Sequence, residues 1–251
     1  MANPEHIQRL RQGTVVWNQW RQKHLTPRPD FNRDYCRGCS LVGAELSNSD
    51  FHGNDLLRAN LSRAHLVQAN LSNASLRKAD LSEAQLYRAN LMQSDARDAN
   101  FNRANLRHAD LIGADLTKAH FVEADLSHTR LIKTILTQSI LIGARLQWAD
   151  FTGASLNGAD LSKTDLRGAN FIGADLRGAC LIGAYLEGAL FEYANLQGAD
   201  FSGAYFAKSS GSNGLTAVDM VSQEAVPERR LLKPQNFEGN KSERAEIAKA
   251  S

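Results

Sequence analysis

Cysteine and long apolar stretches are both scarce in this chain. Three cysteines in 251 residues are too few for the disulfide framework that holds small secreted domains together. No apolar run is long enough to cross a bilayer, and the first ten residues are polar and lack the hydrophobic region of a signal peptide. We therefore expect a soluble, cytoplasmic protein that makes no membrane contact.

An excess of charge of either sign is also absent. The 29 Lys and Arg nearly balance the 27 Asp and Glu. A nucleic-acid-binding protein would need a basic stripe, preferably with aromatic side chains that stack on bases, so we expect no nucleic-acid partner. The sequence also lacks a catalytic triad, a phosphate-binding loop and a nucleotide-binding fingerprint, so it predicts no enzyme, no cofactor and no metal site.

What the sequence has in abundance is a five-residue repeat. From Phe31 to Phe206, every fifth residue is Leu or Phe in 34 of 36 positions, and the exceptions are Cys36 and Ala96. The position two residues earlier is Ala in 26 of 35 cases. A period of five stays on one face of neither an α-helix nor a flat strand, so the chain must turn a corner every five residues. All 14 glycines of this region lie two residues after the Leu or Phe position, which for Gly38 is occupied by Cys36. This indicates a positive φ at that corner position.

The repeat resembles that of the pentapeptide-repeat family. Segments such as 159–163 (ADLSK) and 169–173 (ANFIG) carry its pattern, and the resemblance covers residues 31–208, about 70% of the chain. It implies an all-β fold, a right-handed quadrilateral β-helix in which four pentapeptides form one square coil and the Leu or Phe and the small residue point inward. The repeat then makes a solenoid of about nine coils. Members with an N-terminal helical leader are abundant in cyanobacteria, and this chain is similar to them.

Residues 20 apart should stack on neighbouring coils of such a solenoid. The phenylalanines are therefore expected to form three columns of stacked rings, namely Phe31 with Phe51, Phe101 with Phe121, and Phe151 with Phe171 and Phe191. The Asp and Asn residues that precede the Leu or Phe, such as Asn60 and Asp160, recur at nearly every corner. This regularity favours a structural role in the turns over acid–base catalysis.

Two segments outside the repeat complete the predicted organisation. Residues 1–30 are expected to form a helical cap, because the end of a solenoid needs cover and residues 3–5 (NPE) are typical of a helix start. Trp17 and Trp20 are expected to pack on the end of the rod. Residues 209–251 begin with a linker composition and carry no period, so we expect a mobile tail.

The cysteines and the paired histidines, which are residue types that often bind metals, are interpreted here as structural or surface residues. Cys36 and Cys39 fall in an inward Leu position and the next small-residue position, so we expect buried thiols and no zinc site. Cys180 lies in an outward position and is expected to be the more reactive thiol if it is not shielded. His108 and His128 are 20 apart in one outward column and have no evident third ligand, so we interpret them as ordinary surface histidines.

Apolar residues in outward positions are the sharpest functional signal. One set, which we call the aliphatic group, includes four residues between positions 130 and 142, where the repeat loses its Asp and Asn: Ile132, Ile135, Ile140 and Ile142. Its other two members are Ile112, expected to stack on Ile132, and Val122, expected to stack on Ile142. A second set, the tyrosine group, lies near the C-terminal end and comprises Tyr185, Tyr193 and Tyr205. Exposed apolar clusters often mark protein contacts. We interpret the aliphatic group as a partner or self-association surface, while the tyrosine group is either a partner site or a surface covered by the C-terminal tail.

The sequence therefore predicts a non-enzymatic scaffold for protein–protein interaction, whose partner is unknown. A regulatory role and a homodimer are both compatible with this prediction. The alternative implied by the family resemblance is a DNA-mimicking inhibitor or protector of a topoisomerase such as DNA gyrase, because some pentapeptide-repeat proteins present a strongly acidic rod to that enzyme. Residues 31–208 hold 18 Lys and Arg against 19 Asp and Glu, a net charge of −1, and this balance disfavours the alternative.

Overall fold

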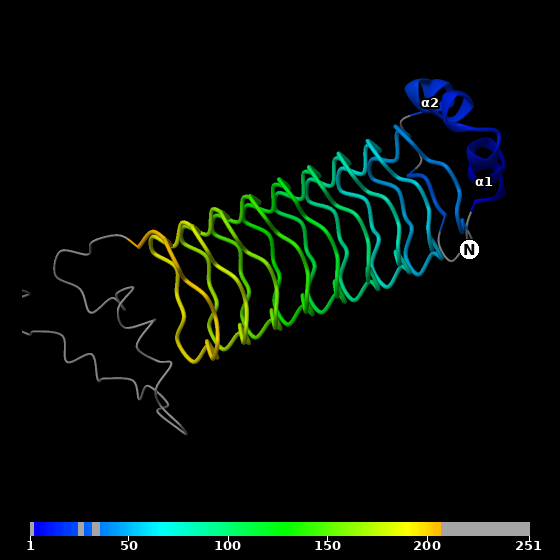
Figure 1. The fold of residues 1–251 in the computed structure, drawn as a ribbon. Helices are drawn as coiled ribbons and strands as arrows, with labels where there is room; N and C mark the ends of the chain where they lie inside the picture. The colour runs from blue at the N-terminus through cyan, green and yellow to red at the C-terminus, as the bar shows by residue number, and fades with distance from the viewer. Residues whose placement is uncertain (1–2, 25–27, 32–35, 207–251) are drawn as a thin grey trace, which may run out of the picture.

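The computed structural model describes residues 3–24, 28–31 and 36–206. They form a long rod of stacked coils with two helices at its N-terminal end (Figure 1). Helix α1 spans Pro4–Arg11 and helix α2 spans Thr14–Lys23. Within the described ranges, neither helix is long and apolar enough to cross a membrane.

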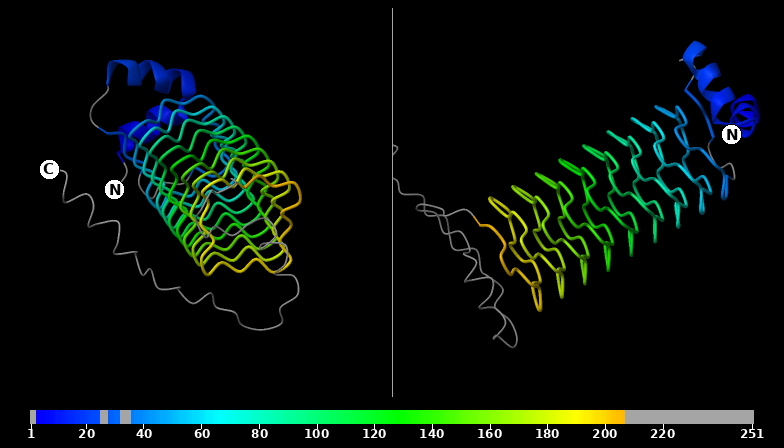
Figure 2. Two further views of the ribbon diagram at one scale, coloured as in Figure 1. Left: turned by 90° about the vertical axis from the view of Figure 1, so that its left-hand side faces the viewer. Right: turned by 45° about the horizontal axis from the view of Figure 1, so that its top comes forward.

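The coils of the rod stack with a register of 20 residues. Parallel bridges join residues 20 apart along the rod, as between Glu45 and His65 or between Tyr185 and Tyr205. Other backbone hydrogen bonds follow the same register, and the N–H of Leu61, for example, donates to the carbonyl of the residue before Leu81 at 2.7 Å. Four pentapeptides thus complete one coil, and the three views agree on coils stacked along one axis (Figure 2).

Leu, Phe and the small residues fill the interior of the rod. Almost all side chains of these two columns are buried between Leu41 and Leu186. The three predicted phenylalanine columns are confirmed, with ring centroids 4.8 Å apart for Phe31 and Phe51, 4.9 Å for Phe101 and Phe121, and 4.7 and 5.0 Å for Phe171 with Phe151 and Phe191. These distances match the spacing of about 4.8 Å between hydrogen-bonded strands, so the stacking of the rings follows from the stacking of the coils.

Every described corner uses a positive φ at the same position of the repeat. Glycines such as Gly113 (φ 67°) confirm the prediction, but 20 other residues, including Lys118 (φ 59°), adopt the same conformation. A hydrogen bond closes each turn, as from the N–H of Ala119 to the carbonyl of Leu116 at 2.9 Å. The ladder of coils therefore imposes the left-handed conformation on residues that would otherwise avoid it, at a cost of about 1 kcal/mol each.

The Asp and Asn side chains stabilise these corners, as predicted. The side-chain oxygen of Asn60 accepts a hydrogen bond from the N–H of Ser62 at 3.0 Å. Asp160 binds the N–H of Ser162 in the same way at 2.9 Å. This turn, in which a side chain replaces a backbone acceptor, recurs along the rod and explains why Asp and Asn dominate the position.

Helix α1 begins where local sequence predicts. Asn3 caps α1, since its side-chain oxygen accepts a hydrogen bond from the N–H of Glu5 at 2.9 Å. Gly13, with φ 110°, separates α1 from α2. The backbone joins this segment to the rod directly, because the N–H of Asn3 donates to the carbonyl of Asp30 at 3.0 Å.

Helix α2 binds backbone groups at the N-terminal end of the rod. Trp17 is fully buried, its ring centroid lies 5.4 Å from that of Phe31, and its Nε1–H donates to the carbonyl of Glu45 at 2.8 Å. The side-chain oxygen of Asn18 accepts from the N–H of Glu45 at 2.8 Å, and its amide donates to the carbonyl of Gly43 at 2.9 Å. The expected packing of Trp17 on the end of the rod is therefore observed.

The prediction of two buried thiols is wrong. Cys36 and Cys39 are half-buried and form a disulfide. They occupy the first and last positions of one corner, where the N–H of Cys39 donates to the carbonyl of Cys36 at 3.2 Å. The turn brings their Cα atoms to 5.3 Å, a separation that a disulfide spans readily. Cys180 is a half-buried free thiol whose Sγ lies 3.1 Å from the hydroxyl of Ser162.

Ser94 provides a prediction about stability. Its hydroxyl is buried in a small-residue position and has no hydrogen-bond partner among the residues that the structure describes. Because an unsatisfied buried hydroxyl is costly, Ser94→Ala should raise the free energy of unfolding by about 1 kcal/mol in urea titrations. Ser139→Ala is the matched control, since the Ser139 hydroxyl donates to the carbonyl of Leu136 at 2.7 Å. An equal gain in both variants would contradict this explanation.

Candidate protein-contact face

Each side of the rod has one outward column in its middle and a corner column at each edge. On the side that we call the tyrosine side, the middle column runs from Glu45 to Tyr205 in steps of 20 residues. At its C-terminal end, Tyr185 and Tyr205 stack with ring centroids 4.8 Å apart. Their side chains are 47% and 59% exposed. Two adjacent coils thus present tyrosine rings at the same place.

The corners of the tyrosine side extend this apolar surface. Ile142 and Ile182 lie at the corner before the middle column, and Trp148 lies at the corner after it, with exposed fractions of 36%, 42% and 64%. The Trp148 ring lies over Gly168, because a Cβ atom there would come within 2.5 Å of a ring carbon. The glycine therefore provides the space that the indole occupies. We define the C-terminal patch as five residues: Ile142, Trp148, Ile182, Tyr185 and Tyr205.

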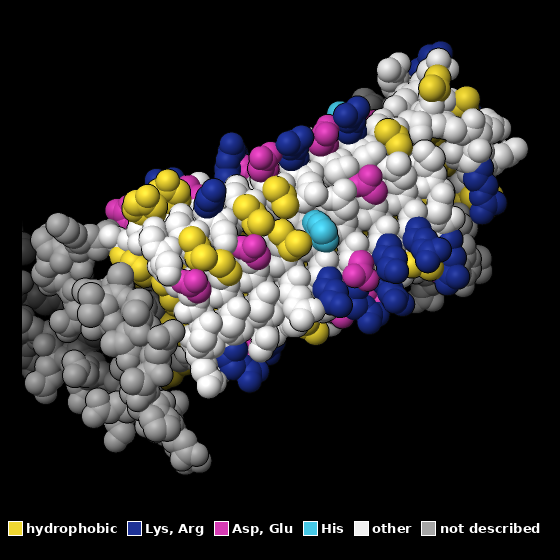
Figure 3. Space-filling view, in the orientation of Figure 1, with side chains coloured by type: hydrophobic (Ala, Val, Ile, Leu, Met, Phe, Trp, Pro, Cys, Tyr) yellow, Lys and Arg dark blue, Asp and Glu magenta, His cyan; other side chains and the backbone are white. Residues whose placement is uncertain are grey.

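The space-filling view shows a related trend along the rod (Figure 3). On the side turned toward the viewer, hydrophobic side chains gather in the C-terminal half. Lys and Arg concentrate along one edge of the N-terminal half. On this face, the C-terminal half is therefore more apolar and the N-terminal half more basic.

The register distributes the predicted aliphatic group over two sides and the corners beside them. Ile112 and Ile132 share one corner, Ile135 and Ile140 lie in the middle of two successive sides, and Val122 and Ile142 share a further corner. Only Ile135 and Ile142 are exposed by more than a third, while the other four are half-buried. The group therefore wraps around the rod and does not form one flat surface.

The tyrosine group is divided in a similar way. Tyr185 and Tyr205 stack, whereas Tyr193, at 55% exposed, lies at a corner beyond the next side. Sequence reasoning missed Trp148 and Ile182. Trp148 could have been found as the one large aromatic residue in a corner column that otherwise holds glycine or polar residues. Ile182 could have been found because it lies in the same column as Ile142.

Two ion pairs lie beside the C-terminal patch. Arg145 Nη1 lies 3.7 Å from Asp125 Oδ2. Arg167 Nη2 lies 2.6 Å from Asp165 Oδ2, and this hydrogen bond lowers the pKa of Asp165 below its usual range. Gln147 also donates to Asp165 at 2.7 Å. A partner that covers the patch would thus bury few unsatisfied charges.

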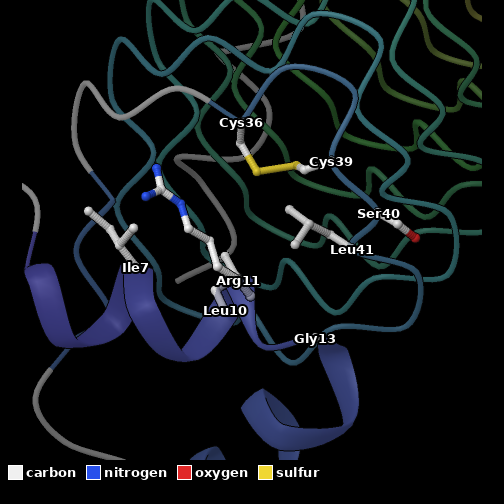
Figure 4. A pocket seen from close by; sticks show the side chains of 8 residues that line it. All are labelled: Ile7, Leu10, Arg11, Gly13, Cys36, Cys39, Ser40 and Leu41. Atoms are coloured by element: carbon white, nitrogen blue, oxygen red, sulfur yellow. A yellow bond between two sulfur atoms is a disulfide. The ribbon is translucent and has the colours of Figure 1, made fainter.

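A cavity of about 230 Å³ lies between α1 and the first coil (Figure 4). Its lining comprises Ile7, Leu10, Arg11, Gly13, Cys36, Cys39, Ser40 and Leu41. Because both cysteines form the disulfide, Arg11 is the one charged side chain of this lining. The lining therefore offers no acid–base pair of the kind that catalysis requires.

The stacked histidines also give no metal site. His108 and His128 lie with ring centroids 4.9 Å apart and planes at 7°, so their stacking is confirmed. Nitrogen lone pairs lie in the plane of each ring and do not converge from two parallel rings. Across the described part of the chain, no group of three His, Cys, Asp or Glu could hold a metal ion.

Comparisons with known proteins agree with this solenoid architecture. The family model for pentapeptide repeats matches eight copies, over residues 35–66, 55–93, 99–138, 119–158, 136–168 and 169–207. The chain therefore belongs to the pentapeptide-repeat family, whose members form right-handed quadrilateral β-helices. No curated protein matches the sequence.

Two solved structures are similar to this one. HetL, a pentapeptide repeat protein involved in heterocyst differentiation regulation in the cyanobacterium Nostoc, is 30% identical, with a TM-score of 0.58 over 84% of this chain and 99% of HetL. Full-length QnrB1, a plasmid-mediated fluoroquinolone resistance protein, is 23% identical, with a TM-score of 0.58 over 71% of this chain and 89% of QnrB1. At that identity, QnrB1 shares the fold alone.

Proposed function

We propose that this protein is a non-enzymatic scaffold for protein–protein interaction and that the C-terminal patch contacts its partner. The observation that carries the proposal is the convergence of five exposed, large apolar side chains on one end of one side of the rod. Aromatic residues in such positions contribute much of the binding energy at protein interfaces. The similarity to HetL, which is involved in regulation, supports a regulatory role for the contact.

The finer architecture belongs to the same proposal. We propose about nine coils over residues 31–208, from the repeat count, and a cap formed within residues 1–30. Residues 1–2, 25–27, 32–35 and 207–208 of these ranges lie outside the described residues. The predicted tail, 209–251, lies outside the described residues. A homodimer through the C-terminal patch is one form of this contact. Ile135, the other exposed member of the aliphatic group, lies on the opposite side of the rod.

The DNA-mimicking alternative has less support from the surface. Basic residues interrupt and neutralise the acids of the columns, as where Arg130 Nη1 lies 2.5 Å from Asp110 Oδ2 on the next coil. Arg63 and Glu83 pair across two coils at 2.9 Å, and Arg103 pairs with the next acid of that corner column. Duplex DNA presents an uninterrupted line of negative charge, which such pairing removes.

The experiment that tests the scaffold is affinity capture from native cell extract with three forms of the full chain. The parent is compared with a patch variant, in which Trp148, Tyr185 and Tyr205 are replaced by serine. The control variant carries Val42→Ser and Ile135→Ser, which are exposed apolar positions outside the patch. We expect the parent and the control to capture the same partner in stoichiometric amounts and the patch variant to lose at least about 90% of it, since these aromatic residues are of the hot-spot type.

Circular dichroism must show the same β-rich spectrum in all three forms, and equilibrium sedimentation of the purified forms tests self-association. Capture that survives in the patch variant would refute the assignment to the C-terminal patch. Loss in the control variant alone would move the contact to the aliphatic group around Ile135.

A further inference from the structure

The corner that carries Trp148 changes character toward the N-terminus. Its two columns hold basic and aromatic residues on successive coils, and we define the basic ridge as Tyr87, Arg88, Arg107, His108 and His128. The remaining corner residues from 87 to 148 are Ser127, Gln147 and Trp148, so this stretch of the corner contains no carboxylate. Arg88, Arg107, His108, His128 and Trp148 are all exposed.

Contacts among the ridge residues hold the side chains in place. The Arg88 guanidinium lies 5.2 Å from the centre of the Tyr87 ring. The Tyr87 and His108 rings meet edge to face at 5.7 Å, and His108 stacks on His128. The N–H of Arg88 donates to the carbonyl of Arg107 at 3.0 Å, which places the two arginines on adjacent coils. The ridge is therefore a continuous and preorganised row.

The positive charge of the ridge is not neutralised by neighbouring acids. Within the described residues, Arg88 and Arg107 make no ion pair, in contrast to Arg97, Arg167 and Arg177, which each bind an aspartate. The nearest acidic positions of the two flanking columns are already occupied, since Asp110 pairs with Arg130 and Asp125 with Arg145. The surroundings of the ridge are thus positive.

The titration of His108 agrees with that environment. Partial desolvation lowers its pKa, and the positive charges of His128, Arg88 and Arg107 lower it further. No carboxylate opposes this shift.

We propose that the basic ridge binds an acidic segment of another protein, with carboxylates on Arg88 and Arg107 and an apolar side chain packed against Trp148. Guanidinium groups form strong, two-pronged hydrogen bonds with carboxylates. The ridge from Arg88 to Trp148 spans three coil spacings, about 14 Å, which corresponds to about four residues of an extended peptide. This inference goes beyond the scaffold function, because no residue of the ridge belongs to the C-terminal patch, and the two surfaces meet only at Trp148.

A nucleic acid fits the ridge less well. Proteins that bind single strands offer free aromatic faces on which bases stack. His108 and His128 cover each other's faces, and Tyr87 is half-buried under the Arg88 guanidinium. What remains accessible is a row of hydrogen-bond donors, which suits carboxylates.

The test measures fluorescence anisotropy of a labelled peptide of four glutamates and a C-terminal leucine, titrated with the full chain at low salt. We expect saturable binding that the double variant Arg88→Ala/Arg107→Ala weakens at least about tenfold. The matched control is Arg58→Ala/Lys118→Ala, which removes two exposed cations from a different corner and should leave the affinity unchanged. Trp148→Ala should weaken binding of this peptide but not that of a peptide of glutamates alone.

The pH dependence adds a second readout. The pKa of His108 lies below its ordinary value, so His108 gains its positive charge only as the pH falls into the acidic range. The glutamates of the peptide stay largely ionised at about pH 5.5, so affinity should rise between about pH 7.5 and about pH 5.5. His108→Gln should abolish this rise and keep the binding that depends on the arginines. Three results would overturn the proposal: equal affinity for the double arginine variant, equal binding of a glutamine peptide, or tighter binding of oligothymidine than of the acidic peptide.

Discussion

Trp17→Ala is expected to lower the free energy of unfolding of the N-terminal coils by about 3–5 kcal/mol, the usual cost of truncating a large core residue. The Trp17 side chain is fully buried, and its ring centroid lies 5.1 Å from Trp20 and 5.4 Å from Phe31. Its indole N–H also pairs the carbonyl of Glu45, which the variant would leave without that donor. The loss therefore combines a cavity with an unsatisfied backbone group.

Urea unfolding and hydrogen exchange measure this effect of Trp17→Ala. Because a solenoid is stabilised by neighbour interactions, exchange should accelerate in the first coils and remain slow near the middle of the rod. Val15→Ala is the control, since Val15 lies on the same helix and is 71% exposed, and its effect should stay within about 0.5 kcal/mol. Unchanged protection of the amides around Glu45 in Trp17→Ala would show that the helices do not stabilise the rod end.

Phe171→Ala should have an effect of similar size in the interior. Phe171 is fully buried between Phe151 and Phe191, with ring centroids 4.7 and 5.0 Å away. Truncation removes a large core side chain, at about 3–5 kcal/mol, and interrupts two stacked pairs. In the variant, the rings of Phe151 and Phe191 would no longer have an aromatic side chain between them.

The control for the Phe171 variant is Ile172→Ala, at the next position, where the side chain is half-buried at a corner. It should cost clearly less than the interior substitution. Thermal unfolding gives the size of each effect, and hydrogen exchange gives its location, which should be the coils on either side of residue 171. Equal loss of protection at the N-terminal coils would contradict the nearest-neighbour description of this rod.

Much of the fold was predictable because its rules are local and are repeated along the chain. The period of five requires a corner at each repeat, and the inward columns place Phe151, Phe171 and Phe191 above one another. The helix start at Asn3 and the break at Gly13 depend on a few adjacent residues. The cysteine prediction was wrong because it considered columns separately, whereas Cys36 and Cys39 are opposite ends of one turn.

The candidate site was only partly predictable. Tyr185 and Tyr205 are exposed and stacked, as their spacing indicates. Ile112 and Ile132 are half-buried, whereas Ile142 and Ile182, at the equivalent position of the repeat, are exposed. Trp148 was missed because its corner position was associated with glycine and polar residues, although the backbone there accepts an indole when Gly168 leaves space beside it.

The sequence by itself determined the five-residue repeat. Its resemblance to a repeat family then predicted the 20-residue register and the residues that point outward, because these depend on backbone geometry repeated every five residues. Only the tertiary structure decided how much of each outward side chain is exposed and which charges are paired. Those properties depend on side chains one coil away and across a corner, as for Trp148 over Gly168 and for Arg88 beside Arg107. The same contacts distinguish the C-terminal patch and the basic ridge from the rest of a nearly neutral surface.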